Sequence, residues 1–122
     1  MAAHADLWGD ITPSAVRTPA SILREQASLL GAKTRHTIEG QVETQISVGT
    51  FYHSFNLVVP ALENYSYELF KISHQLTLYP IYVGYPDPNA EDEQAFVKWL
   101  GQKLSSAETK RIIGNLLAQA NS

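Results

Sequence analysis

The stretch from Thr37 to Val83 constrains the fold most strongly, because its apolar residues recur with a period of two. Successive side chains of a strand point to opposite faces, so this period predicts a β-sheet. Nine of the chain's twelve aromatic residues fall between Phe51 and Tyr85, inside or next to this sheet. One helical pattern precedes the stretch and two follow it. We therefore expect the helices to bury their apolar faces against the sheet.

Four strands are predicted within this stretch, over residues 38–48, 51–59, 65–72 and 76–83. Between the first two, Gly49 and Thr50 fit a two-residue type II′ turn, which has glycine at its first position. Pro60 ends the second strand. In the third strand the apolar phase shifts, which predicts either two covered faces or a β-bulge. Pro80 has no N–H to donate, so the fourth strand is expected at an edge or a bulge.

The three predicted helices have recognisable start and stop residues. Thr18, followed by proline, is a good N-cap for the first helix, and Gly31 a natural stop for it. Asn89 can cap the second helix after a loop rich in proline and glycine. Ser105 begins a capping-box pattern for the third. The very short connection between the last two helices predicts an angled or antiparallel pair.

Together these patterns predict one α+β domain spanning residues 1–122, in the order α-β-β-β-β-α-α. The sheet is expected to be a four-stranded antiparallel meander in a two-layer arrangement, with the N-terminal helix and the two C-terminal helices on one face. Residues 1–17 read as an irregular N-terminal arm. Trp8 in this arm is expected to dock onto its own domain, with a second subunit as the alternative.

Composition narrows the classes of function. With a net charge of −3 and scattered basic residues, the chain offers no basic stripe for a nucleic acid. It contains no cysteine, which excludes disulfides and thiolate metal sites. The N-terminal segment has no apolar run long enough for a signal sequence or a membrane span. We therefore predict a cytoplasmic protein with no nucleic-acid or membrane partner.

Motifs that carry enzyme chemistry are not evident. His36, His53 and His74 lack metal-binding spacings, and no glycine-rich phosphate loop or serine-nucleophile motif occurs. Glu39 and Glu43 lie roughly 13 Å apart along one strand, too far for a coupled acid and base. The phase of its strand predicts that His53 is a satisfied core histidine, whereas His74 falls in a predicted exposed turn. These observations predict no metal and no cofactor, and they favour a role other than catalysis.

Two hypotheses for function follow. The first is a protein-interaction or oligomerisation module, acting as a homodimer or on another protein through the aromatic face of the sheet, because tyrosine combines a large ring with a polar tip. Its candidate residues are Tyr52, Tyr65, Tyr67, Tyr79, Tyr82 and Tyr85. The alternative is a small-molecule-binding protein or hydrolase with a pocket between the first helix and the sheet. Gln26 and His53, polar residues on apolar faces, would line this pocket.

Overall fold

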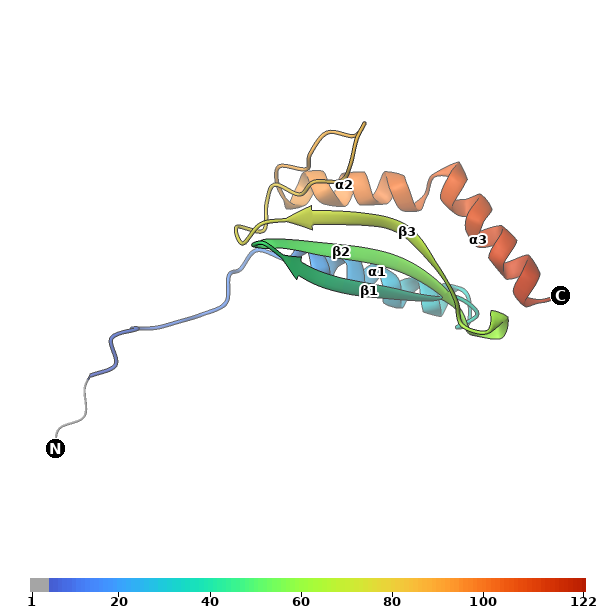
Figure 1. Cartoon of the computed structure of the whole chain (residues 1–122), viewed down its shortest axis with the longest axis horizontal. Coiled ribbons are helices and arrows are strands. Elements are labelled where there is room, and N and C mark those ends of the chain that lie inside the picture. Colours follow the sequence, from blue (N-terminus) through green and yellow to red (C-terminus); the bar gives the residue numbers. More distant parts are fainter. Residues whose placement is uncertain (1–4) are drawn as a thin grey trace.

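Over residues 5–122 the protein forms a three-stranded antiparallel sheet with three α-helices packed on one of its faces (Figure 1). The computed structural model describes residues 5–122, so the first four residues of the predicted arm lie outside it. The elements are α1 (Pro19–Lys33), β1 (Glu39–Ser47), β2 (Thr50–Val59), the short 3-10 helix η1 (Pro60–Leu62), β3 (Tyr65–His74), α2 (Glu93–Leu104) and α3 (Ala107–Ala120). The predicted α+β class and antiparallel sheet are confirmed.

The sheet has the strand order β1-β2-β3, and β2 pairs with both neighbours along its length. Val42, Phe55 and Phe70 stand opposite one another across the three strands, so their side chains share one face. A β-bulge places Leu69 as an extra residue in β3, because Phe55 pairs with Phe70 but the next residue of β2 pairs with Glu68. This bulge explains the shift of apolar phase in the third strand.

Helix α1 begins as its sequence predicts, with the Thr18 hydroxyl accepting from the Ser21 N–H and proline at the first position. The helix crosses β1 closely at Gly40. A Cβ at Gly40 would lie 2.7 Å from both the Cα and the Cβ of Ala27. Only glycine therefore permits this approach of helix to strand.

The core lies between the sheet and the helices. Its buried residues come from α1, β2, β3, α2 and α3 and from the segments that join these elements, and half-buried residues of β1 and η1, Val42 and Leu62, pack against them. Its fully buried members include Leu23, Ile38, Phe55, Leu57, Val59, Ile72, Ile81 and Phe96. At the hairpin end of the sheet, Ile46 is exposed, although the period of its strand predicts a covered side chain.

The predicted fourth strand is not formed. Segment 76–83 makes only isolated bridges, between Ser73 and Tyr82 and between Ile81 and Ala90. Pro80 donates no N–H, and Leu78 adopts a φ of 75°, which is incompatible with an extended strand. Too few consecutive extended residues remain to build a ladder, so the sheet keeps three strands.

Smaller differences concern turns and caps. The β1–β2 turn consists of Val48 and Gly49, both with positive φ as a type I′ turn requires, and is thus one residue earlier than predicted. Asp92, not Asn89, caps α2 by accepting from the Ala95 N–H. Ser106 caps α3 in place of its neighbour Ser105. Within residues 5–122, no helix combines the length and apolar character needed to cross a bilayer.

Candidate functional site

A cleft of about 490 Å³ lies between α1, the sheet and the α2–α3 pair. Its lining is mostly apolar, and it is open along one side. Segments far apart in the sequence supply the lining: Gln26, Leu29, Leu30 and Lys33 of α1, Phe55, Leu57 and Leu69 of the sheet, and Gly101, Leu104, Ser105, Thr109, Lys110 and Ile113 of the two C-terminal helices and their junction. Leucine and isoleucine side chains form its walls and the sheet forms its floor.

The charged side chains of this cleft all have the same sign. Lys33 comes from the last turn of α1 and Lys110 from the first half of α3, and both are exposed. No acidic residue is part of the described lining. Neither lysine forms an ion pair with another residue of the range 5–122. Gln26 adds an amide that can both donate and accept hydrogen bonds. The cleft thus combines apolar walls with positive charge at two of its sides.

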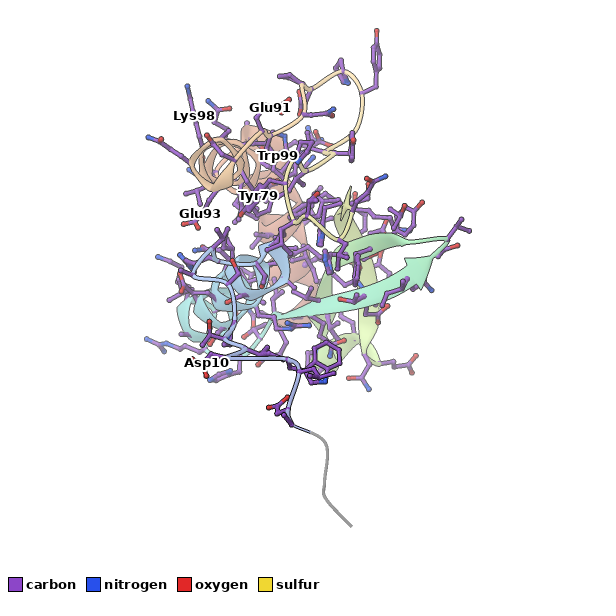
Figure 2. The ribbon with its side chains drawn as sticks, turned by 90° about the vertical axis from the view of Figure 1, so that its left-hand side faces the viewer. Asp10, Tyr79, Glu91, Glu93, Lys98 and Trp99 are labelled. Atoms are coloured by element: carbon purple, nitrogen blue, oxygen red, sulfur yellow. The ribbon has the colours of Figure 1, made fainter. Side chains whose placement is uncertain are left out.

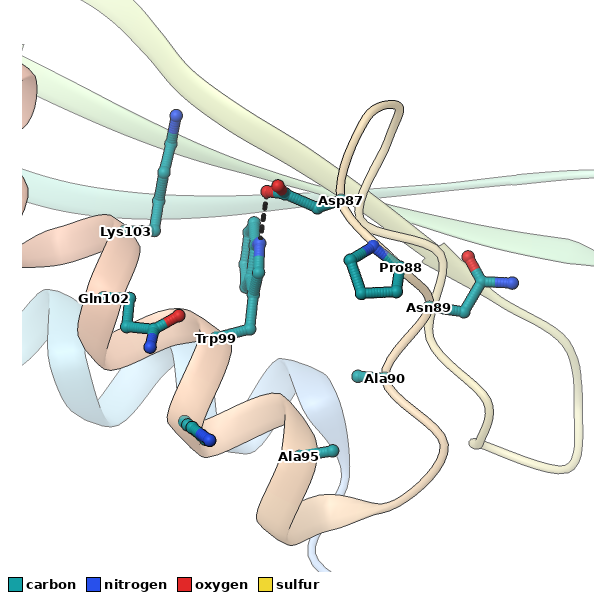
Figure 3. A pocket seen from close by; sticks show the side chains of 9 residues that line it. Asp87, Pro88, Asn89, Ala90, Ala95, Trp99, Gln102 and Lys103 are labelled. Atoms are coloured by element: carbon teal, nitrogen blue, oxygen red, sulfur yellow. Dashed lines mark hydrogen bonds between the residues drawn. The ribbon is translucent and has the colours of Figure 1, made fainter.

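A second cavity, of about 500 Å³, lies between the 87–90 loop and one side of α2 (Figure 3). Trp99 stands in its centre and donates its indole N–H to Asp87 at 2.9 Å. Lys98, Gln102 and Lys103 complete the side formed by the helix. Only one loop and one helix build this loop cavity, and more of its lining is polar than in the cleft. The hydrogen bond between Trp99 and Asp87 holds the loop against α2.

The two buried histidines form a hydrogen-bonded pair. His53 Nε2 and His74 Nε2 are 2.8 Å apart, and the side chains are only 3% and 4% exposed. Thr44 Oγ1 lies 2.8 Å from His53 Nδ1, and the Gln75 carbonyl lies 2.7 Å from His74 Nδ1. Phe51 stacks on the His74 ring with a centroid separation of 5.3 Å. The prediction that His74 is exposed was wrong, because β3 extends two residues beyond its predicted end and carries this side chain inward.

The hydrogen-bond partners fix one of the protons. A carbonyl oxygen only accepts, so His74 Nδ1 donates to the Gln75 carbonyl. A single proton lies between the two Nε2 atoms, and the Thr44 hydroxyl can donate to His53 Nδ1 or accept from it. Burial, followed by the effects of His74 and Arg24, lowers the pKa of His53 from its ordinary 6.5 to about 4. The His53 ring is thus held neutral, and both ring nitrogens of each histidine have a hydrogen-bond partner, which is a structural arrangement. His53 does not line the cleft.

The six tyrosines do not gather on one face. Tyr65 and Tyr67 stand opposite Val59 and Leu57, on the side that faces the helices. Tyr52 pairs with Ser73, which bridges to Tyr82, so these two tyrosines lie on the uncovered face. Tyr85 is fully exposed in the loop before α2.

Tyr79 lies at the base of the N-terminal arm, where its hydroxyl donates to the Arg17 carbonyl at 3.1 Å. Burial and then the charge on Glu93 raise the pKa of Tyr79, which keeps the hydroxyl protonated as this hydrogen bond requires. Figure 2 shows Tyr79 and Glu93 together at this end of the domain, while Asp10 lies out on the arm. Arg17 also donates its backbone N–H to Glu93 Oε1 at 3.2 Å.

Among residues 5–122, no group of three or more His, Cys, Asp or Glu side chains could hold a metal ion. Comparisons with protein-family models, with curated proteins and with solved structures find no match for this chain.

Of the residues proposed for a pocket, Gln26 lies in the cleft and His53 does not. Sequence reasoning missed Lys33 and Lys110. The only available signal was that each lysine lies within one turn of apolar residues that also line the cleft, Leu30 in α1 and Ile113 in α3.

Proposed function

We propose that this protein is a protein-interaction module that holds an apolar, acidic peptide segment in the cleft between α1, the sheet and the α2–α3 pair. The observation that carries this proposal is the combination of apolar walls with Lys33 and Lys110 and no acidic lining residue. Apolar side chains of a partner would be removed from water between Leu29, Leu30 and Ile113. Carboxylates of the same partner would lie near the lysines, which adds specificity and steers association.

The shape of the cleft favours a peptide over a compact ligand. Small molecules usually bury 70–90% of their surface in an enclosed pocket, whereas this cleft is open along one side. An open trough bounded by helices suits a segment that places some side chains inward and leaves others in water. The exposed side chain of Leu29, at one margin of the trough, would become covered in such a complex.

A small-molecule-binding role is a second candidate, supported by the volume of the cleft. About 490 Å³ falls within the range of ligand pockets, and Gln26 supplies a polar group against apolar walls. An amphipathic anion would use the same lysines. The sheet face opposite the helices, which carries Tyr52 and Tyr82, is a candidate for a separate protein contact, because both residues pair with Ser73 there and none of the three α-helices of residues 5–122 packs on it.

Selection from a random peptide display library against the immobilised protein tests the proposal. Enriched peptides should combine large apolar residues with Asp or Glu. They should lose most of their affinity for Lys33→Glu plus Lys110→Glu. The matched control, Lys98→Glu plus Lys103→Glu, makes the same charge change in the loop cavity and should retain binding. Enriched peptides without acidic residues, or equal loss in both double variants, would contradict the proposal.

A further inference from the structure

The N-terminal arm carries apolar side chains that the structure leaves in water. Leu7 is 91% exposed, Trp8 81% and Ile11 70%, and they lie within five consecutive residues. Figure 1 shows this arm extending away from the sheet and from all three helices. A tryptophan, a leucine and an isoleucine this close together are a strong apolar anchor once a surface covers them.

The arm is also acidic where the cleft is basic. Between residues 5 and 16 its charged residues are Asp6 and Asp10. The charged residues of the cleft are Lys33 and Lys110. The free edge of β1 is a poorer surface for the arm, because Glu39 and Glu43 lie on that strand and would repel its carboxylates. Charge and apolar character together therefore match the arm to the cleft.

The base of the arm directs it away from its own cleft. Arg17 is fixed by three contacts: its N–H donates to Glu93, its carbonyl accepts from Tyr79, and its guanidinium pairs with Glu25 at 3.0 Å. These contacts lie at the N-terminal ends of α1 and α2, whereas the cleft lies toward the C-terminal ends of both helices. To reach its own cleft the arm would have to reverse direction at Arg17 and run back about 18 Å along α1.

We propose that the arm of one chain, residues 5–16, occupies the cleft of a second copy of the chain, and that two chains exchange arms reciprocally. This inference rests on the proposed function of the cleft and names its occupant. Leu7, Trp8 and Ile11 enter the apolar trough of the partner copy, and Asp6 and Asp10 lie toward its lysines. A two-fold axis lets both arms and both clefts be used at once, which is a common route to a dimer.

A charge exchange between arm and cleft tests this proposal. Variant A carries Asp6→Lys plus Asp10→Lys, so that a basic arm meets a basic cleft. Variant B carries Lys33→Glu plus Lys110→Glu, so that an acidic arm meets an acidic cleft. Sedimentation equilibrium should show a dimer for the natural chain, and dimerisation weakened at least about tenfold for A alone and for B alone. Mixing A with B restores opposite charges at both contacts and should restore a dimer containing one copy of each.

The matched control is a third variant, Lys98→Glu plus Lys103→Glu, which reverses charge in the loop cavity. It should dimerise as the natural chain does. Its mixture with A should form less heterodimer than the mixture of A with B, because only one of the two arm–cleft contacts then joins opposite charges. A second readout uses Trp8 in protein that carries Trp99→Phe. Its emission should move to shorter wavelength as the dimer forms, because the ring leaves water.

The proposal is overturned if the natural chain is monomeric at all concentrations, or if A and B together form no heterodimer. In either case a synthetic peptide of residues 5–16, added to variant A, separates the two claims. The peptide could bind variant A and lose this binding when Lys33→Glu and Lys110→Glu are added. That result would show that the cleft binds acidic apolar segments and that only the exchange of arms between two chains is wrong. If neither this peptide nor any peptide from the display library bound the cleft, the proposed function would fail with it.

Discussion

Replacing His53 with glutamine should make the protein's stability less dependent on pH on the acid side of neutrality. In the folded state, burial and then the nearby His74 and Arg24 hold the pKa of His53 at about 4, compared with 6.5 in an unfolded chain. Between these values the unfolded state binds the extra proton. The free energy of unfolding therefore falls as pH drops through 6.5 and stops falling, for this group, near pH 4.

The size of the effect follows from the two pKa values. Lowering the pH from about 7.5 to about 5 should cost about 2 kcal/mol of unfolding free energy through His53 alone. His53→Gln keeps an uncharged polar side chain that can bond Thr44 or His74, but it removes the titrating ring. The variant should start from a lower stability and lose about 2 kcal/mol less over the same pH interval.

Urea unfolding, followed by circular dichroism at a series of pH values, measures this difference. Ile72→Val is the control, because Ile72 faces His53 in the β2–β3 register and is fully buried. It should cost about 1 kcal/mol at every pH while keeping the full pH dependence. If His53→Gln lost stability toward pH 5 as steeply as the natural chain does, the lowered pKa of His53 would be refuted.

Two further predictions concern the elements that shape the cleft. Gly40→Ala should lower the free energy of unfolding by about 1–3 kcal/mol, because the added Cβ would meet Ala27 at 2.7 Å. Gly114→Ala should instead raise it by up to about 1 kcal/mol, because this helix position has no atom within 4 Å of an added Cβ. Chemical denaturation of both variants measures the contrast. Asp92→Ala should cost about 1 kcal/mol through loss of the α2 N-cap, and Asp92→Asn, which can still accept from the Ala95 N–H, should recover most of it in the same assay.

Local residue chemistry predicted most of the elements of the fold. Thr18 and the proline after it start α1, and Pro60 ends β2, because these signals act within a few residues. Errors of one residue arose where neighbours are chemically equivalent. Ser105 and Ser106 can both cap a helix, and only the packed structure shows which one accepts from the Thr109 N–H.

The prediction of a fourth strand was wrong for a different reason. The alternation of Tyr79, Ile81 and Val83 is a strand pattern, and these apolar residues are indeed buried or half-buried. Their burial comes from a segment that crosses the sheet edge with isolated bridges. The left-handed φ of Leu78 could not be foreseen, because a leucine rarely adopts it and no glycine marked the position.

The candidate site was predicted only in part, since it depends on how helices meet. Gln26 stood out because it interrupts an apolar face, and the structure places it in the cleft. Lys33 and Lys110 are 77 residues apart by their numbers and come together only through the packing of α1 and α3 against one sheet face. The pairing of His53 with His74 likewise depends on the register between β2 and β3. It was not predicted, because the predicted third strand ended at residue 72 and left His74 outside the sheet.

The most direct test of the central claim is to map by NMR where an acidic apolar peptide binds the protein. The peptide with the sequence of residues 5–16 would be added to variant A, alongside a control peptide in which both Asp residues are replaced by Lys. We expect saturable shifts in the methyl signals of the cleft, at Leu29, Leu30, Leu69, Leu104 and Ile113, and much weaker binding of the control peptide. Shifts confined to the hairpin end at Ile46 and Val48, or equal binding of both peptides, would contradict the claim.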